Sequence, residues 1–200
     1  FRLGAFPTLS TYIFPKIVKE VKSIMPDLRL ILIEEKTDIL IEKLRSGEID
    51  AALLALPVKD DFLVINKLFD DEFYLAVPVE HELAKEKRIE QASLREHSLL
   101  LLEEGHCLRD QALEICHING IYEEQDFKAT GMETLRQMVK SGTGITFIPK
   151  IAIDSNDEDI RYIPFKKPEP YRTIGIVCRK TTVRKQVIDN LTEILISKNN

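Results

Sequence analysis

Two cysteines carry the most reactive chemistry in this sequence, and both stand in the segment 103–117, which reads EEGHCLRDQALEICH. Cys107 is expected between a buried strand, residues 99–102, and the helix that follows it. There its thiol lies close to backbone N–H groups at the positive end of the helix dipole, and His106 and Arg109 add positive charge. These features favour the thiolate, which is the reactive form of cysteine. The alternative is a buried, inert thiol.

The spacing of the two cysteines limits what they can do together. Cys116 follows Cys107 by nine residues, which on a continuous helix is about 13.5 Å of rise and about 900° of rotation, so the side chains lie on opposite sides. A disulfide needs Cα atoms within about 7 Å of each other. The two cysteines can therefore pair only if the helix unwinds locally, as a redox switch requires. Alternatively, Cys116 is a core residue, since Leu113 and Ile115 flank it, and the spacing alone leaves both interpretations open.

Metal binding is a weaker interpretation of the same segment. The dipeptides His106-Cys107 and Cys116-His117 offer four zinc ligands, but they lack the short CxxC spacing of most zinc sites, and we expect no metal and no cofactor. The sequence contains no GxGxxG, Walker or GxSxG motif. The third cysteine, Cys178, is expected in a sheet. A sparse, odd cysteine count does not indicate a secreted disulfide framework and favours a reducing compartment, the cytoplasm.

Composition restricts the class of protein further. The chain has 200 residues, 44% of them hydrophobic, which is enough for a substantial core. With 28 basic and 33 acidic residues its net charge is −5, which excludes a generally basic nucleic-acid binder. No apolar run approaches the roughly 20 residues of a membrane span.

Strand and helix patterns alternate along the chain, which predicts an α/β fold with parallel strands. A loop of hydroxyl residues, 8–11, is expected before the first helix, so that Pro15 falls in its first turn. The expected strands are 1–6, 28–33, 49–56, 64–68, 73–77, 99–102, 127–129, 145–148, 160–165 and 173–177. The expected helices are 12–25, 36–46, 92–96, 108–119, 132–141 and 183–196.

Two lobes of about 100 residues are the simplest arrangement of these elements. Residues 1–70 with 175–200 form the first, and residues 71–174 form the second, which contains both cysteines of the reactive segment. A ligand is expected in a central cleft between the lobes, at the carboxyl ends of strands and the N-termini of helices.

The reactive segment resembles that of the peroxide-sensing LysR-type transcription regulators. The resemblance rests on GHCLRDQA at 105–112 with a second cysteine nine residues after the first. It is supported by ATGMETLRQMV at 129–139, SGTGITFIP at 141–149 and KPEPYRTIGIV at 167–177. It covers the whole chain as a regulatory domain. It implies two Rossmann-like lobes with a central cleft, as in periplasmic binding proteins.

The resemblance implies a role for six residues. Cys107 resembles the peroxidatic cysteine, which hydrogen peroxide converts to a sulfenic acid, and Cys116 resembles the resolving cysteine that forms the disulfide with it. The residues that match the family's peroxide pocket are Thr8, Thr37, His106 and Arg172. Alternatively, the two threonines are helix caps and the arginine is a surface salt-bridge partner. Asp126 stands where family members can carry a histidine, so a role for that histidine does not transfer.

The resemblance also implies partners. DNA is bound by a winged helix-turn-helix joined through a linker helix, and neither is in this sequence, so we expect this segment not to bind operator DNA by itself. Hydrogen peroxide, a homodimer or homotetramer and a resetting thiol reductant, glutaredoxin or thioredoxin, are expected partners. RNA polymerase is a further partner of the complete regulator, and no membrane is involved.

Two other functions remain open alongside the sensor. One is an effector or solute-binding domain for a small organic ligand, in which both cysteines are passive. The other is a thiol enzyme such as a peroxidase, which differs from a sensor in needing a fast reductant cycle. We expect the sensor, and not an enzyme, because pairing of these cysteines must remodel a helix and because the family resemblance is centred on them.

Overall fold

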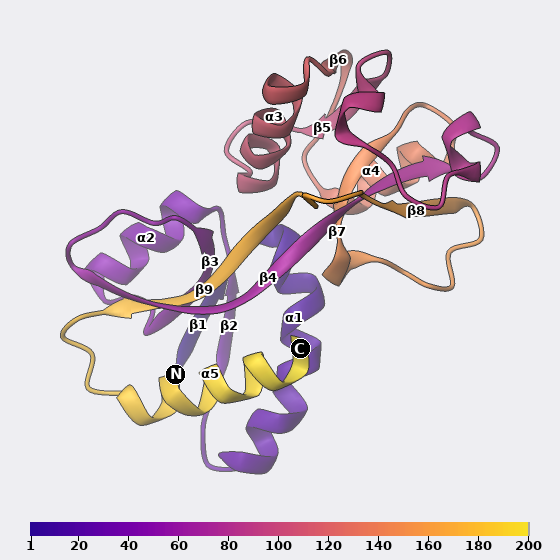
Figure 1. Ribbon diagram of the computed structural model, residues 1–200. Coiled ribbons are helices and arrows are strands. Elements are labelled where there is room, and N and C mark those ends of the chain that lie inside the picture. The colour runs from indigo at the N-terminus through magenta and orange to yellow at the C-terminus, as the bar shows by residue number, and fades with distance from the viewer. Residues whose placement is uncertain (200) are drawn as a thin grey trace. The chain divides into compact units, whose positions relative to one another are not determined.

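The computed structural model describes residues 1–199, with the backbone alone at Ile118, Asn119, Gln125, Asp126 and Asn199. The chain divides into two compact units (Figure 1). The first is formed by Phe1–Asp70 and the segment from Thr173 onward, and the second by Asp71–Arg172. Thr173 and Ile174, expected in the second lobe, belong to the first unit because they pair with Leu56 and Ala55 there.

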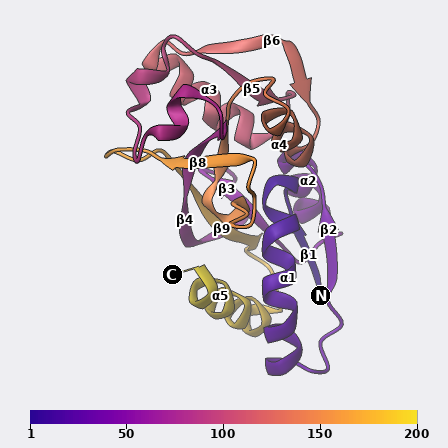
Figure 2. The ribbon, with the colours of Figure 1, turned by 90° about the vertical axis from the view of Figure 1, so that its right-hand side faces the viewer.

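The first unit is built on parallel strands, as the alternating pattern predicted. Strand β1 pairs in parallel with both β2 and β3, and β9 pairs with β3 in the antiparallel direction. Helix α1 packs against β1, β2 and α5, and helix α2 packs against β1 and β3 (Figure 2). The elements of this unit are β1 (Arg2–Ala5), α1 (Pro7–Ile24), β2 (Ile31–Glu34), α2 (Thr37–Ser46), β3 (Ala51–Leu56), α5 (Lys185–Asn199) and parts of β4 (Leu63–Pro78) and β9 (Tyr171–Arg179).

Helix α1 begins earlier than predicted. The expected loop at residues 8–11 is wrong, because Pro7 occupies the start of the helix, where its missing N–H costs no hydrogen bond. The hydroxyls of Ser10 and Thr11 then bond back to the Pro7 carbonyl at 3.4 Å. Pro15 consequently lies inside the helix and not in its first turn.

The second unit repeats the strand–helix pattern with a second parallel pair. Strand β5 pairs in parallel with β6, and β4 pairs in the antiparallel direction with β7 and β8. The β6 strand is longer than the predicted 127–129. The further elements of this unit are three short 3-10 helices, η1 (Glu82–Lys85), η2 (Gln91–Leu94) and η3 (Lys150–Ala152), with β5 (Ser98–Leu102), α3 (Cys107–Asn119), β6 (Tyr122–Ala129), α4 (Met132–Lys140), β7 (Thr146–Pro149) and β8 (Ile160–Pro164).

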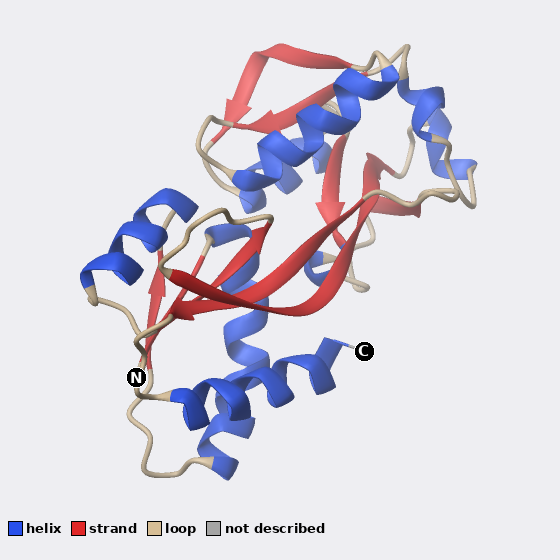
Figure 3. Cartoon of the chain, turned by 60° about the vertical axis from the view of Figure 1, so that its left-hand side comes forward, coloured by secondary structure: helices blue, strands red, loops and turns tan. Residues whose placement is uncertain are grey.

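Strands β4 and β9 neighbour each other, and each has residues in both units (Figure 3). Two strands were predicted where β4 is continuous, because three acidic residues, 70–72, interrupt its apolar pattern. Each has a cationic partner: Asp70 pairs with Lys67, Asp71 with Arg172 and Glu72 with Lys150. Asp70 also accepts from the Thr173 hydroxyl at 2.6 Å. The acidic residues therefore continue the strand because their charges are matched.

No helix among residues 1–199 is long and apolar enough to cross a membrane.

The Asp71–Arg172 ion pair gives a test of how the second unit is held together. The Arg172 side chain is 0% exposed and Asp71 2%, so Asp71→Asn removes the carboxylate that is paired with a buried guanidinium. We expect a loss of about 3–5 kcal/mol in the free energy of unfolding. Asp70→Asn is the matched control, because Asp70 is 40% exposed, and it should cost about 1 kcal/mol or less. Urea denaturation measures the free energy of unfolding of both variants. Equal losses would show that the buried Asp71–Arg172 pair contributes no more than the exposed Asp70.

Candidate functional site

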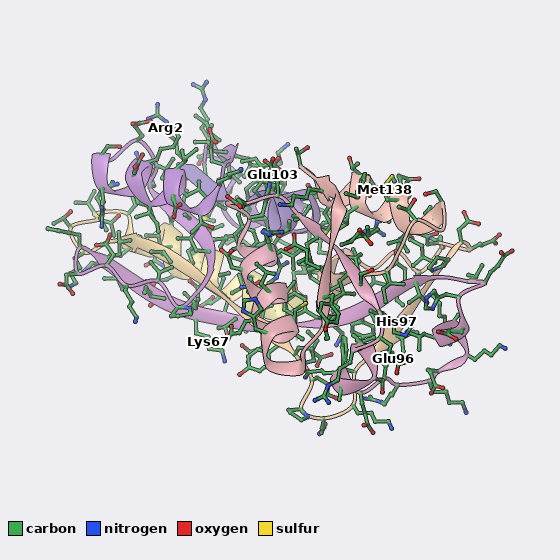
Figure 4. All side chains as sticks on the ribbon, turned by 90° about the horizontal axis from the view of Figure 1, so that it is seen from above. Arg2, Lys67, Glu96, His97, Glu103 and Met138 are labelled. Atoms are coloured by element: carbon green, nitrogen blue, oxygen red, sulfur yellow. The ribbon has the colours of Figure 1, made fainter. Side chains whose placement is uncertain are left out.

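Cys107 is the first residue of α3, directly after the turn that leaves β5. The turn depends on Gly105, whose φ of 85° is a left-handed conformation that favours glycine. Glu103, labelled in Figure 4, lies in the same turn and donates its backbone N–H to the Ala129 carbonyl at 2.9 Å. The turn thereby places Cys107 at the carboxyl ends of a parallel strand pair, at a helix N-terminus, as the sequence predicted.

Helix α3 is continuous between the two cysteines and presents them to different surroundings. Its buried stripe contains Leu108, Ala112, Ile115 and Cys116, the last of them 1% exposed. Cys107 is half-buried. All three cysteines of the chain lie in its described part and are thiols. The expectation of opposite faces on an intact helix is confirmed, and Cys116 is a core residue in this form.

Burial also sets the acidity of Cys116. Desolvation is the main cause, with a smaller contribution from the negative charge of Glu123, and together they raise the pKa of the thiol from 9.0 to about 11. At neutral pH this thiol is protonated, and it is a poor nucleophile until it leaves the core. Burial likewise raises the pKa of Cys178, which lies on β9 opposite Ala51, as expected for a cysteine in the sheet.

Arg109 has a different role from the one that the sequence suggested. Its guanidinium bonds the Glu123 carboxylate as a fork, with Nη2 donating to Oε2 at 3.0 Å, and Nη1 also donates to the Leu102 carbonyl at 3.0 Å. This bond raises the pKa of Arg109. Its charge is thus matched by Glu123 and ties α3 to β5 and β6.

His106 is the N-cap residue of α3 and is almost fully buried. Its Nε2 lies 4.0 Å from a Glu103 carboxylate oxygen. Its carbonyl accepts from the Arg109 N–H at 2.9 Å, which begins the helix. His106 is therefore held next to Cys107 by the backbone of the first turn.

Thr8 and Thr37 lie in the first unit, at the starts of neighbouring helices. Ala5 and Glu34 are paired across the parallel strands β1 and β2, and each threonine follows its paired residue by three positions. The helix-cap alternative is wrong for both, because the N-cap positions are Phe6 and Lys36. Thr8 is buried. Both hydroxyls are thus first-turn groups and not caps.

Two buried oxygen atoms have no hydrogen-bond partner among the residues that the structure describes. One is Thr37 Oγ1, and the other is Gln111 Oε1 on α3. Gln111 was not singled out from the sequence, although it stands four residues after Cys107 and hence on the same face of the helix. A buried acceptor without a donor is costly, and such atoms are candidates for binding a small hydrogen-bonding ligand.

Arg172 is a salt-bridge partner, but a buried one. Its Nε donates to Asp71 Oδ2 at 3.0 Å, while Asp71 Oδ1 accepts from the Ile151 backbone N–H at 3.1 Å. No local sequence pattern points to Asp71, which is 101 residues away from its partner.

The structure thus places His106 and Cys107 together at the start of α3, with Cys116 nine residues further along on the opposite face. It places Thr8 and Thr37 together beyond one end of a parallel strand pair in the other unit. The side chain of Asp126 lies outside the described residues. The two His/Cys dipeptides considered for zinc stand at opposite ends of α3, about 13.5 Å apart along its axis, too far to share an ion.

Two α/β units with helices starting at the carboxyl ends of parallel strands define a ligand-binding regulatory fold, and the family comparison agrees. The family model described as the LysR substrate binding domain matches residues 1–199. The chain belongs to the LysR substrate-binding domain family.

Particular relatives are similar over nearly the whole chain. The reduced form of the OxyR regulatory domain from Pseudomonas aeruginosa matches with a TM-score of 0.90 and 35% identity, covering 98% of this chain and 96% of that one. The oxidized form of OxyR matches with a TM-score of 0.88 and 36% identity, covering 99% and 94%.

Curated proteins give the same result. The chain is 37% identical over 195 residues to the DNA-binding transcriptional dual regulator OxyR of Escherichia coli K12, covering 96% of this chain and 64% of that protein. It is 38% identical over 179 residues to the hydrogen peroxide-inducible genes activator of Haemophilus influenzae, covering 88% and 60%. The chain thus spans about three fifths of the length of these relatives.

The high pKa of Cys116 predicts slow alkylation in the folded protein. At pH 8 a thiol with a pKa of about 11 is about 0.1% thiolate, against about a tenth at the ordinary value of 9.0. We expect iodoacetamide to label Cys116 about 100-fold more slowly in the folded chain than in urea, with the folded rate still rising as the pH approaches 11.

The raised pKa of the Cys116 thiol also makes the free energy of unfolding depend on pH. Because the folded state holds the thiol proton more tightly, the contribution of Cys116 is complete below about pH 9 and is lost as the pH rises toward 11. Peptide mass spectrometry measures the labelling rates, and equal rates for folded and unfolded chains would show that Cys116 is accessible.

Proposed function

We propose that this chain is the sensing domain of a hydrogen-peroxide-responsive LysR-type transcription regulator, in which Cys107 and Cys116 form a reversible disulfide. One observation carries the proposal: a half-buried cysteine begins an intact helix whose other cysteine is buried on the opposite face. Oxidation then cannot be completed without changing the backbone. The similarity to OxyR domains in reduced and oxidized forms supports it.

The first step is oxidation of Cys107. Its thiolate attacks one oxygen of hydrogen peroxide, so that a sulfur–oxygen bond forms as the oxygen–oxygen bond breaks. The bond's electron pair leaves with the second oxygen as hydroxide, which takes up a proton and becomes water. The sulfur is oxidised by two electrons to a sulfenic acid. The helix N-terminus favours the thiolate that this step needs.

The second step closes the disulfide. The Cys116 thiol gives up its proton and attacks the sulfur of Cys107, forming the sulfur–sulfur bond as the sulfur–oxygen bond breaks. The hydroxyl group leaves and combines with the proton as water. Because Cys116 is buried and its pKa is about 11, this step requires part of α3 to unwind first. Slow resolution and a changed backbone are two results of the same burial.

Four further residues are proposed to line the peroxide pocket. Thr8 and Thr37 supply hydroxyls and His106 an imidazole, which can orient peroxide by hydrogen bonds. Arg172 supplies positive charge for the thiolate and the departing hydroxide. The buried Thr37 Oγ1, with no partner among residues 1–199, supports this role because a bound peroxide can donate to it.

The complete regulator is proposed to bind DNA through a winged helix-turn-helix, to act in the cytoplasm as a homodimer or homotetramer, and to contact RNA polymerase. A thiol reductant, glutaredoxin or thioredoxin, resets it by thiol–disulfide exchange. Because a reductant acts once per signal, no enzymatic turnover is needed.

The switch is tested by peptide mass spectrometry after about one equivalent of hydrogen peroxide. We expect a Cys107–Cys116 disulfide in the parent chain and a trapped sulfenic acid at Cys107 in Cys116→Ser. Cys178→Ser is the control and should form the same disulfide.

Other outcomes decide between the alternatives. If Cys107 stays a thiol while glutathione is oxidised, the sensor function is wrong and both cysteines are passive residues of a small-ligand effector domain. Sustained peroxide consumption with a thioredoxin system would instead indicate a peroxidase.

The pocket is tested by Thr37→Val. We expect the rate constant for oxidation of Cys107 to fall by about tenfold or more. The free energy of unfolding should stay the same or increase, because the valine keeps the shape of a side chain whose hydroxyl has no partner to lose. Thr11→Val, at an exposed hydroxyl in the first turns of α1, is the control and should leave the rate unchanged. An unchanged rate in Thr37→Val would remove Thr37 from the site.

A further inference from the structure

The fork between Arg109 and Glu123 joins the first turn of α3 to β6. Arg109 is the third residue of the helix and Glu123 the second residue of the strand. Their side chains are only 8% and 13% exposed, so the two parallel hydrogen bonds act largely away from water. The third bond, to the Leu102 carbonyl, fixes the same guanidinium to the end of β5. One side chain therefore holds three elements around Cys107.

Disulfide formation strains this arrangement. The Cα atoms of Cys107 and Cys116 must approach from about 13.5 Å along the helix to within about 7 Å. The residues between them must leave the helical path, and Arg109 is the second of these residues. A guanidinium anchored at both β5 and β6 cannot follow the moving segment and keep its fork.

Glu123 opposes oxidation in a second way. Its negative charge is one cause of the raised pKa of Cys116 and so helps to keep the resolving thiol protonated. The same carboxylate thus holds the start of the helix in place and disfavours the nucleophile near its end.

We propose that the Arg109–Glu123 ion pair is a latch that stabilises the reduced conformation of α3 and thereby sets the reduction potential and the resolving rate of the disulfide. The proposal rests on the proposed function and adds two positioning residues to it. The latch is not part of the first step, because the Arg109 guanidinium is bonded to Glu123 and to the Leu102 carbonyl. It acts on the second step, in which the helix must open.

The test compares Glu123→Gln with Glu169→Gln. Glu169 forms an ion pair with Arg88 at 3.0 Å in the same unit, and neither residue belongs to α3, β5 or β6, so the control removes the same charge from the same residue type. The disulfide fraction is measured in glutathione buffers of known ratio. We expect Glu123→Gln to raise the oxidation equilibrium constant about tenfold, which moves the midpoint potential down by about 30 mV. Glu169→Gln should keep the parent value.

The kinetic part separates the two steps. Sulfenic acid formation, followed in a Cys116→Ser background, should stay within about twofold of the parent rate in Glu123→Gln, whereas disulfide closure should be about tenfold faster. Arg109→Lys retains the charge but loses the fork, so it should shift the potential in the same direction by less. It decides the test if Glu123→Gln does not fold.

The outcomes distinguish this proposal from the proposed function. If the disulfide forms in every variant with the parent's potential, and melting temperatures fall equally in both redox forms, the ion pair is structural and the latch is wrong. If the parent chain forms no Cys107–Cys116 disulfide, the proposed function fails instead.

Discussion

The intact helix between Cys107 and Cys116 is the constraint on which the chemistry of this domain depends. Hydrogen bonds of the helix backbone keep the two sulfur atoms on opposite faces, and the burial of Cys116 adds the free energy of a packed core to that separation. Any reaction that joins the sulfur atoms has to disrupt these hydrogen bonds and this packing. The free-energy difference between the reduced form and the proposed disulfide form therefore comes from ordinary helix packing.

Asymmetry between the two thiols follows from their positions alone. A cysteine at the start of a helix is close to favourable electrostatics and partly accessible, whereas one in the buried stripe is desolvated and protonated. In the proposed function, the order of events, attack at Cys107 and resolution by Cys116, therefore follows from these two positions. The other proposed pocket residues differ as well. Thr37 has a buried hydroxyl oxygen without a partner among the described residues, whereas Arg172 is paired with Asp71.

The sequence predicted those features that depend on local periodicity. The helix that follows Cys107 and contains Cys116, and the parallel strands of the first unit, follow from residue spacing within one or two elements. The predicted start of α1 was wrong because Pro7 can begin a helix as well as end a strand. The continuous β4 was missed because Asp70 and Asp71 are polar in sequence but matched in space.

Long-range pairs account for the rest of what the sequence missed. From the sequence, Arg109 was interpreted as a positive charge beside Cys107. In the fold its guanidinium is bonded to Glu123, which is 14 residues further on and in a different element. The bulge between Leu99 and Leu101 in the β5–β6 pairing shifts the register there, and no local pattern predicts it. The orphaned oxygen of Thr37 is also visible only when every neighbouring donor has been placed.

The pairing of Asp70 with Thr173 has a consequence for how the chain is connected. The second unit is one uninterrupted stretch, while the first is assembled from two segments whose cut ends are hydrogen-bonded at 2.6 Å. In the chain topology, the second unit is an insertion between Asp70 and Thr173, at a surface position. A very short loop could connect these two residues in its place. The first unit can begin folding before the insertion is synthesised, but it can be completed only after the insertion has left the ribosome, because β9 and α5 come last in the sequence.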